Sequence, residues 1–379
     1  MGMKVLVFLW FKHATCFVIG LGFCLSAVAE SNMDYLRSIK KIDVHVHDRA
    51  DEAFVREVQV EDNWKSITIC VDSGNRVLTD LQRQVSQELY QKYPRHYAWI
   101  TAFTVDGIWE PGWQQRAINQ LKHDFENGAV GVKVWKYIGM GLRTPEGEYV
   151  QLDHPIFAPI FDFIAEQGKT LIAHMGEPIH AWMPTYTTED GIPRNYWANN
   201  PQYSFYDKPE LPSYSDIMAA RDHVLANHPN LRFVGAHLAS LEFDVAEIAM
   251  RMELYPNFAV ELGGRARYLM WQARGKVRAF FMKYQDRIMY GTDLGVTPGM
   301  TDEQRMDRKA RIRERHRLFG QYLATDDQMP FGDLLRGDKP ARGTEYYVTG
   351  LALPEEVLKK VYYDNVLEWF PGAEEGYEE

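Results

Sequence analysis

The sequence predicts an α/β protein, a TIM-type (β/α)8 barrel, because short apolar runs alternate with amphipathic, helix-like segments along the chain. There are eight such runs, the number of strands that closes this kind of barrel. Gly128, Gly168 and Pro229 end three of the helix-like segments just before the next run begins. The 379 residues would allow one large domain or two ordinary ones, and the unbroken alternation favours one.

The expected strands are short and mostly apolar. In chain order they are Ile42–His47, Ile67–Val71, Ala98–Phe103, Ala129–Trp135, Thr170–His174, Leu231–His237, Phe258–Leu262 and Ile288–Thr292. The helices expected between them include Leu81–Lys92, Gln114–Asn127, Ile156–Gln167, Ser215–Asn227 and Val277–Tyr284. A last helix, Pro354–Phe370, is expected to close the domain.

The first expected strand carries two histidines that point the same way. Side chains alternate between the faces of a strand, so His45 and His47 should share a face with Asp43, while the apolar residues of Ile42–Val46 pack against helices. Two neighbouring imidazoles can bind one divalent cation. Paired histidines on strands also occur without a metal, so this motif alone leaves both interpretations open.

Composition and charge exclude some classes of protein. The chain is 46% hydrophobic and 25% charged, which is typical of a soluble globular protein. Its formal net charge of −10 argues against nucleic acid and against anionic lipid as partners.

Residues 1–29 have the pattern of a secretory signal peptide. Lys4 and Lys12 give a basic beginning, an apolar stretch follows, and residues 27–29 form a small-x-small cleavage site. The alternative is an uncleaved membrane anchor, although the stretch is short for a bilayer. Cleavage would leave residues 30–379 as the barrel domain of a secreted or periplasmic protein without membrane contact. It would change the net charge from −10 to −12, and Cys70 alone would remain, which excludes an intrachain disulfide.

One expected connection, residues 178–212 after the fifth strand, is long for a compact domain. It is rich in aromatic side chains: His180, Trp182, Tyr186, Tyr196, Trp197, Tyr203, Phe205 and Tyr206. This composition favours an ordered lid rather than a disordered segment. Exposed aromatic residues are also typical of interfaces, so a contact in a homodimer is the alternative.

Polar residues stand at or near the ends of four later strands. The fifth and sixth strands end on His174 and His237, the eighth is followed by Asp293, and Lys133 lies within the fourth. Alternation places Lys133 opposite three valines and therefore toward the barrel interior. Each residue alone has an ordinary explanation, such as a hydrogen-bonded core histidine. Because the carboxyl ends of barrel strands meet at one mouth, together they indicate one shared site.

This order of residues resembles the amidohydrolase superfamily: His-x-His on the first strand, lysine on the fourth, histidine on the fifth and sixth, and aspartate on the eighth. The segment Leu353–Phe370 is similar to the closing helix of the amidohydrolase-related branch. That branch contains metal-dependent hydrolases, lactonases and relatives of aminocarboxymuconate-semialdehyde decarboxylase. The resemblance covers residues 41–370 and implies the same barrel and a metal site.

The resemblance implies a first metal ion bound by His45, His47 and Asp293. Nitrogen and oxygen ligands suit Zn²⁺ first and Mn²⁺ second. Whether one or two ions bind stays open.

A second ion, if present, would be bound by His174 and His237 and bridged by Lys133 as a carbamate. In single-metal members His174 stays a ligand, and His237 acts as acid or base or polarises the substrate. The alternative for Lys133 is an ordinary lysine paired with a carboxylate.

The expected function is therefore a secreted metal-dependent hydrolase of an amide, lactone or ester. A bound divalent metal acidifies water to a pKa of about 7, and Asp293 can accept the water proton and pass it to the leaving group. A non-oxidative decarboxylase on the same scaffold is the alternative, and no residue decides between them.

The expected substrate is a small molecule, for which a carboxylated, a cyclic or an aromatic compound are the open alternatives. Arg265 and Arg267 follow the seventh strand and could bind a carboxylate, although each could equally be a surface residue. Glu177 could join the site or cap a turn, and Trp135 could form part of the pocket wall or pack in the core.

Overall fold

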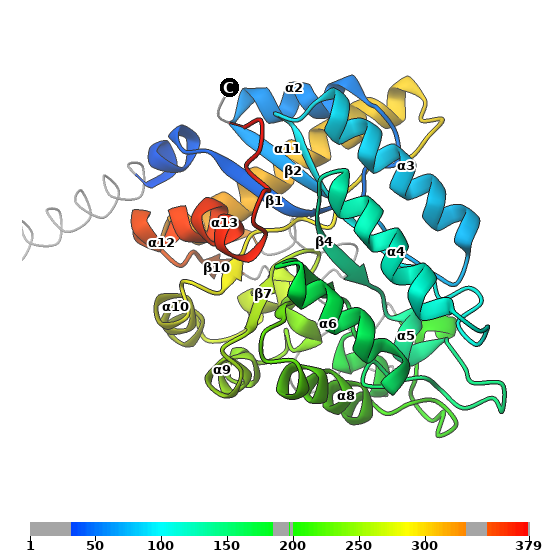
Figure 1. Cartoon of the computed structure of the whole chain (residues 1–379). Coiled ribbons are helices and arrows are strands. Elements are labelled where there is room, and N and C mark those ends of the chain that lie inside the picture. Colours follow the sequence, from blue (N-terminus) through cyan, green and yellow to red (C-terminus); the bar gives the residue numbers. More distant parts are fainter. Residues whose placement is uncertain (1–31, 185–196, 198–199, 331–346, 378–379) are drawn as a thin grey trace, which may run out of the picture.

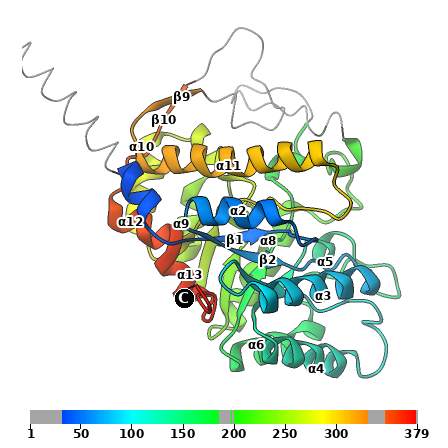
Figure 2. The ribbon, with the colours of Figure 1, turned by 90° about the horizontal axis from the view of Figure 1, so that it is seen from above.

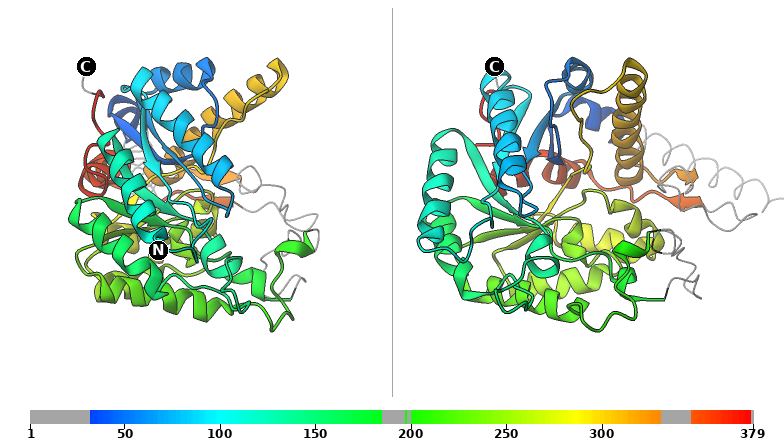
Figure 3. Two further views of the ribbon diagram at one scale, coloured as in Figure 1. Left: turned by 45° about the vertical axis from the view of Figure 1, so that its right-hand side comes forward. Right: turned by 90° about the vertical axis from the view of Figure 1, so that its right-hand side faces the viewer.

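The computed structural model describes residues 32–184, 197, 200–330 and 347–377. Eight parallel strands pair in sequence order, and helices lie on their outer side (Figures 1 and 3). The strands are β1 (Lys41–Val46), β2 (Trp64–Ile69), β3 (Tyr97–Thr101), β4 (Ala129–Val134), β5 (Thr170–Ala173), β6 (Arg232–Gly235), β7 (Phe258–Glu261) and β8 (Ile288–Met289). Each matches one expected run, so the predicted (β/α)8 barrel is confirmed.

The barrel closes where the eighth strand returns to the first. The Val44 N–H donates to the Tyr290 carbonyl at 3.1 Å, and the Asp293 N–H donates to the His45 carbonyl at 2.8 Å. Val46 forms a parallel bridge with Leu294 beyond the end of β8. This closure brings the chain after β8 directly beside the histidines of β1.

The longer helices follow the strands in the order expected of a barrel. They are α2 (Ala53–Glu61), α3 (Arg76–Lys92), α4 (Trp113–Glu126), α6 (Ala158–Glu166), α8 (Tyr214–Asn227), α9 (Val245–Leu254), α10 (Arg274–Lys283) and α11 (Asp302–Ala324). Shorter turns are α5 (Tyr137–Met140), η1 (Pro155–Phe157), η2 (Ile179–Trp182), η3 (Pro201–Tyr203), η4 (Leu238–Ser240) and η5 (Ala266–Trp271). A two-stranded sheet pairs β9 (Gln328–Pro330) with β10 (Tyr347–Thr349).

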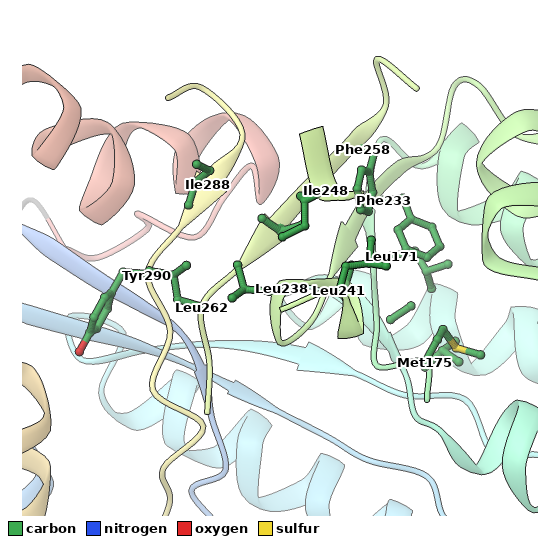
Figure 4. Packing of buried hydrophobic residues seen from close by; sticks show 14 of the residues in the cluster. Leu171, Met175, Phe233, Leu238, Leu241, Ile248, Phe258, Leu262, Ile288 and Tyr290 are labelled. Carbon is green, nitrogen blue, oxygen red and sulfur yellow. The ribbon is translucent and has the colours of Figure 1, made fainter. Parts of the chain in front are cut away.

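The apolar core lies mainly between the strands and the surrounding helices. Leu171, Phe233 and Phe258 project from neighbouring strands in this layer, where Ile248 of α9 also lies (Figure 4). The rings of Phe233 and Phe258 are 6.2 Å apart between centroids. Fully burying one such side chain stabilises the fold by about 2 kcal/mol.

A bulge in β1 changes which side chains face the interior. Pairing with β2 shifts register between Asp43 and Val46. Asp43 therefore lines a crevice with Val55 and other residues of α2, on the helix side of the strand. Val44 instead joins a cluster to which most of the strands contribute. The expectation that Asp43 shares a face with the histidines is wrong, because an extra residue in a strand inverts the alternation beyond it.

The C-terminal segment covers the amino-terminal end of the barrel. The expected helix Pro354–Phe370 consists of α12 (Glu355–Lys359), a π-helical turn (η7, Lys360–Asp364) and α13 (Asn365–Trp369). The Asn365 amide donates to the carbonyls of Gln285 and Ile288, at 2.7 and 2.8 Å, where β8 begins. The carboxyl ends of the strands stay free for a site.

The long helix α11 lies alongside α2 (Figure 2). Three of its basic side chains pair with carboxylates in or just before α2: Arg305 with Glu52, Lys309 with Glu57, and Arg313 with Glu61. Exposed pairs of this kind each contribute only about 0–1 kcal/mol. They orient α11, while its buried residues are concentrated in its second half, from Ile312 to Ala324.

His316 of α11 should make the fold sensitive to acid. Its ring stacks on Trp64 at 4.0 Å, and Tyr290 contacts its Nδ1 at 3.1 Å. Burial, reinforced by the positive charges of Lys41 and Arg315, lowers the pKa of His316 from 6.5 to about 3. His316 therefore binds a proton near pH 6.5 in the unfolded chain but only near pH 3 in the folded chain. The free energy of unfolding consequently falls as the pH drops from about 6.5 toward 3.

Urea unfolding of wild type and His316→Gln at pH 7 and pH 4.5 tests this effect. Wild type should lose about 2 kcal/mol more than the variant over this range, allowing for partial exposure of the ring. Equal losses in the two proteins would assign the acid sensitivity to other groups.

Candidate metal-binding site

Three of the predicted ligand atoms converge at the carboxyl ends of β1 and β8. His45 Nε2 lies 3.2 Å from His47 Nε2, and His47 Nε2 lies 3.2 Å from Asp293 Oδ1. His45 Nε2 and Asp293 Oδ1 are 3.7 Å apart. The three residues form one of two groups, among the described residues, whose ligand atoms lie close enough to hold a metal ion.

Glu261 fixes the orientation of His45. Its carboxylate Oε1 lies 2.9 Å from His45 Nδ1, so the imidazole donates from Nδ1 and keeps a lone pair on Nε2. That lone pair points at His47 and Asp293, two further electron-rich groups. Nitrogen and oxygen donors at such short separations fit a divalent cation, and a carboxylate behind a ligating histidine is the usual arrangement.

His237 has the same tautomer as His45, with the proton on Nδ1. Its Nδ1 lies 2.6 Å from the Gly263 carbonyl, which can only accept, so Nε2 carries the lone pair. Its ring centroid is 4.6 Å from that of His45 and 4.2 Å from that of His174. In this tautomer His237 can act as a ligand or a base, whereas polarising a substrate carbonyl would require it to be protonated.

His174 reaches the same site but lies outside both ligand groups. It follows β5, and its Nε2 is 3.4 Å from a guanidinium nitrogen of Arg265. His174 therefore lies beside His237, but its ring nitrogens are not among the ligand atoms that gather around His45.

Lys133 projects into the barrel beneath the site, as its place in the alternation predicts. Its side chain is buried, and within the described part of the structure its Nζ has no hydrogen-bond partner. Burial lowers its pKa to about 8, against the opposing effect of the carboxylates of Glu261 and Asp293. A buried amine with a depressed pKa and no partner is suited to chemical modification.

Burial holds the imidazoles neutral. It is the main reason that the pKa values of His45, His174 and His237 lie well below 6.5, and nearby positive groups add to it. Burial works to raise the pKa of Asp293, but interactions with His237 and His47 outweigh it and keep that pKa well below 3.8. Neutral imidazoles and an ionised carboxylate are the forms in which these groups bind metals.

A cavity of about 540 Å³ opens over His174, His237 and Asp293. Its wall is aromatic and cationic, and includes Trp135, Lys136, Tyr137, Glu177, Pro178, Trp197, Tyr203, Phe205, Arg265, Arg267 and Tyr268. Four of these belong to residues 178–212, so described parts of that connection line the cavity. Tyr186 and Tyr196 lie outside the described residues.

Arg265 is the buried cation of this cavity. Its guanidinium donates to Ser240 Oγ at 2.9 Å and to Glu242 Oε2 at 3.2 Å. Glu177 lies 3.7 Å away and also pairs with Lys136. Arg265 and Glu177, both left open by the sequence, are therefore part of the site wall.

Sequence reasoning missed Glu261. It ends β7 and is fully buried, and its carboxylate contacts two of the predicted site residues. The available signal was its position, a carboxylate at the carboxyl end of an apolar strand just before two glycines. The same criterion selected His174 and His237.

An eight-stranded parallel barrel with histidines and an aspartate gathered at the carboxyl ends of its strands defines the architecture of a barrel enzyme. The sequence matches the profile of the amidohydrolase family over residues 42–372. The chain therefore belongs to the amidohydrolase family, an enzyme family whose members use divalent metals. No curated protein sequence matches it.

Several solved structures are similar to this chain. The 2,6-dihydroxybenzoate decarboxylase from Rhizobium is 12% identical, with a TM-score of 0.50, over 87% of this chain and 98% of that one. A probable 2-pyrone-4,6-dicarboxylic acid hydrolase from Acinetobacter baumannii is 13% identical, with a TM-score of 0.43, over 88% and 99%. The 4-oxalomesaconate hydratase from Rhodopseudomonas palustris is 11% identical, with a TM-score of 0.45, over 88% and 96%.

The expected signal peptide, residues 1–29, lies outside the described residues. Among the helices that are described, none combines the length and the apolar character that a membrane span requires.

Proposed function

We propose that this amidohydrolase-family protein is a metal-dependent hydrolase of a small, carboxylated amide, lactone or ester. The observation that carries the proposal is the convergence of His45 Nε2, His47 Nε2 and Asp293 Oδ1 within 3.7 Å below an open cavity. Three such donors leave room for a further ligand, the arrangement of catalytic rather than structural metal sites.

His45, His47 and Asp293 would hold the cation, with Zn²⁺ the first candidate and Mn²⁺ the second. When bound, such a cation supplies Lewis-acid chemistry and makes water more acidic. A second cation would use His237 and His174, with Lys133 as a carbamate. Among the described residues the buried Nζ of Lys133 has no hydrogen-bond partner, which supports a carbamate at this position. A site with two cations is suited to activating water, so this arrangement favours hydrolysis.

The protein's own groups then move the proton. Asp293 is an ionised carboxylate beside the cavity, so it can accept a proton from the attacking water and deliver it to the leaving group. His237 Nε2 is a second acceptor, on a ring whose centroid lies 4.6 Å from that of His45.

Arg265 would bind the substrate carboxylate. Its contacts with Ser240 and Glu242 hold the guanidinium in a fixed direction at the cavity wall, and a planar guanidinium binds a carboxylate through two parallel hydrogen bonds. Lys136 is a second cationic side chain in the cavity wall, where it pairs with Glu177.

Arg265→Lys should weaken substrate binding more than turnover. Lysine keeps the charge opposite Glu242 but loses the two-pronged contact, so KM for a carboxylated substrate should rise about 10- to 100-fold while kcat changes less. Steady-state kinetics measure both. The matched control is Arg251→Lys, because Arg251 pairs with Asp222 and Glu247 and is not part of the cavity wall. Equal KM values for wild type and Arg265→Lys would remove Arg265 from substrate binding.

A decarboxylase is the second candidate. The aromatic side chains Trp135, Tyr137 and Tyr268 stand beside cationic Arg265 in one cavity, a combination that suits a flat aromatic acid as well as a lactone. In that case the proton delivered by the site would go to carbon, and no water would be incorporated.

The experiment that separates the two candidates uses Zn²⁺- and Mn²⁺-loaded protein with a panel of carboxylated lactones, esters, amides and aromatic acids in water enriched in ¹⁸O. Acid release with one ¹⁸O per product supports the hydrolase. Release of carbon dioxide without ¹⁸O in the remaining product would replace it by the decarboxylase. Absence of both reactions, with no cation bound, would contradict both proposals.

A further inference from the structure

We propose that Glu261 is a positioning residue that sets the cation-binding face of His45 and the backbone of His237 with one carboxylate. The inference rests on the proposed function, because it concerns how this chain prepares its cation site. Its test is chosen so that the two can fail separately.

The contacts of Glu261 span three strands. Oε1 accepts a hydrogen bond from His45 Nδ1 at 2.9 Å and one from the His237 N–H at 2.5 Å. Oε2 accepts from the Gly263 N–H at 2.5 Å. The ligand atoms of Glu261, His45 and His237 lie close enough together to hold one cation directly. Protein N–H donors already occupy both oxygens of Glu261, however, so we assign the carboxylate to orienting the two histidines.

Two glycines make room for this carboxylate. A side-chain carbon at Gly291 would lie 2.5 Å from Glu261 Oε2, and one at Gly263 would lie 2.6 Å from the same oxygen. Either distance is far shorter than a normal contact. The absence of a side chain at Gly263, after β7, and at Gly291, after β8, therefore leaves the space that the Glu261 carboxylate fills.

The backbone that Glu261 holds is strained. His237, Leu238, Ala239 and Ser240 all have positive φ values, between 56° and 58°. For residues other than glycine this conformation costs about 1–2 kcal/mol each, so it persists only where surrounding contacts fix it.

Hydrogen bonds hold that left-handed turn along its whole length. Arg221 donates to the Ala239 carbonyl at 2.8 Å, and the Tyr214 hydroxyl donates to the Ser240 carbonyl at 2.5 Å. Glu261 holds the beginning of the turn, at the residue whose side chain enters the site. Without this acceptor, the buried His237 N–H would lose its partner.

The test is cobalt binding to cation-free wild type and Glu261→Gln, measured by competition with a chelator and by the visible spectrum of bound Co²⁺. Glutamine has the same size, but its amide cannot accept three N–H groups. We expect affinity to fall about 10- to 100-fold and the spectrum to change. Asp124→Asn is the matched control, since Asp124 is equally buried but pairs with Arg83 and Thr101. Its affinity should stay within about threefold of wild type.

The outcomes separate the two claims. Wild type that binds no cobalt would overturn the proposed function and this inference with it. Wild type that binds, together with Glu261→Gln of equal affinity and identical spectrum, would overturn the inference alone.

A second measurement covers a variant that does not fold. In ¹⁵N NMR spectra of cation-free wild type labelled at histidine, with His45→Asn used for assignment, His45 should carry its proton on Nδ1. A proton on Nε2 would overturn the role assigned to Glu261.

Discussion

Replacing Asp293 by asparagine should reduce kcat by about a thousand-fold while much of the bound cation is retained. Asparagine keeps an oxygen near His47 Nε2, which is 3.2 Å from Oδ1 in wild type, but it cannot accept and return a proton. The left-handed φ of 58° at Asp293 is tolerated by asparagine as well as by aspartate, so the backbone should not change.

Kinetics and metal content measured on the same preparation test this prediction. Asp286→Asn is the control, because its carboxylate is exposed just before β8 and should affect neither quantity. If Asp293→Asn kept wild-type kcat, the proton would be carried by another group, with His237 the first alternative.

His45→Ala should lose cation and activity together. This change removes a nitrogen donor and leaves Glu261 Oε1 without its bond from Nδ1. Affinity should fall at least about 100-fold and activity about a thousand-fold, with about 1–3 kcal/mol of stability lost because the buried carboxylate loses one of its three hydrogen bonds.

His223→Ala is the matched control for His45→Ala. Its side chain is 63% exposed and pairs with Asp153 outside the site, so cation content, activity and stability should match wild type. Metal analysis, kinetics and urea unfolding measure the three effects. Full activity in His45→Ala would exclude His45 from the site.

The strands were predictable because burial leaves a direct trace in the sequence. Each strand of a parallel barrel is covered on both faces, so it appears as a short apolar run, and polar residues at the ends of these runs mark the mouth. His45, His47, His237 and Asp293 could be brought together on that basis. The structure confirms the barrel and places all four at one end.

Other features depend on tertiary contacts that no local pattern records. Helix α11 has few apolar residues in its first half and is held partly by ion pairs to α2, so periodicity does not reveal it. The register shift at Asp43 comes from pairing with β2. The role of Glu261 depends on the fold, which brings His45 of β1 and the backbone of His237, after β6, to its carboxylate.

The expectations for residues 1–29, for secretion and for a homodimer remain predictions. Residues 1–31 lie outside the described part of the chain, and the charge and composition that motivate these expectations do not depend on the barrel. N-terminal sequencing of the mature protein and sedimentation analysis would test them.

Anomalous X-ray scattering at the zinc and manganese edges, from crystals of the protein purified without chelators, tests the central claim most directly. We expect a peak about 2 Å from His45 Nε2, His47 Nε2 and an Asp293 carboxylate oxygen. A second peak between His237 and a modified Lys133 would add the second ion. An active enzyme whose crystals show no anomalous peak among these three residues would contradict the account.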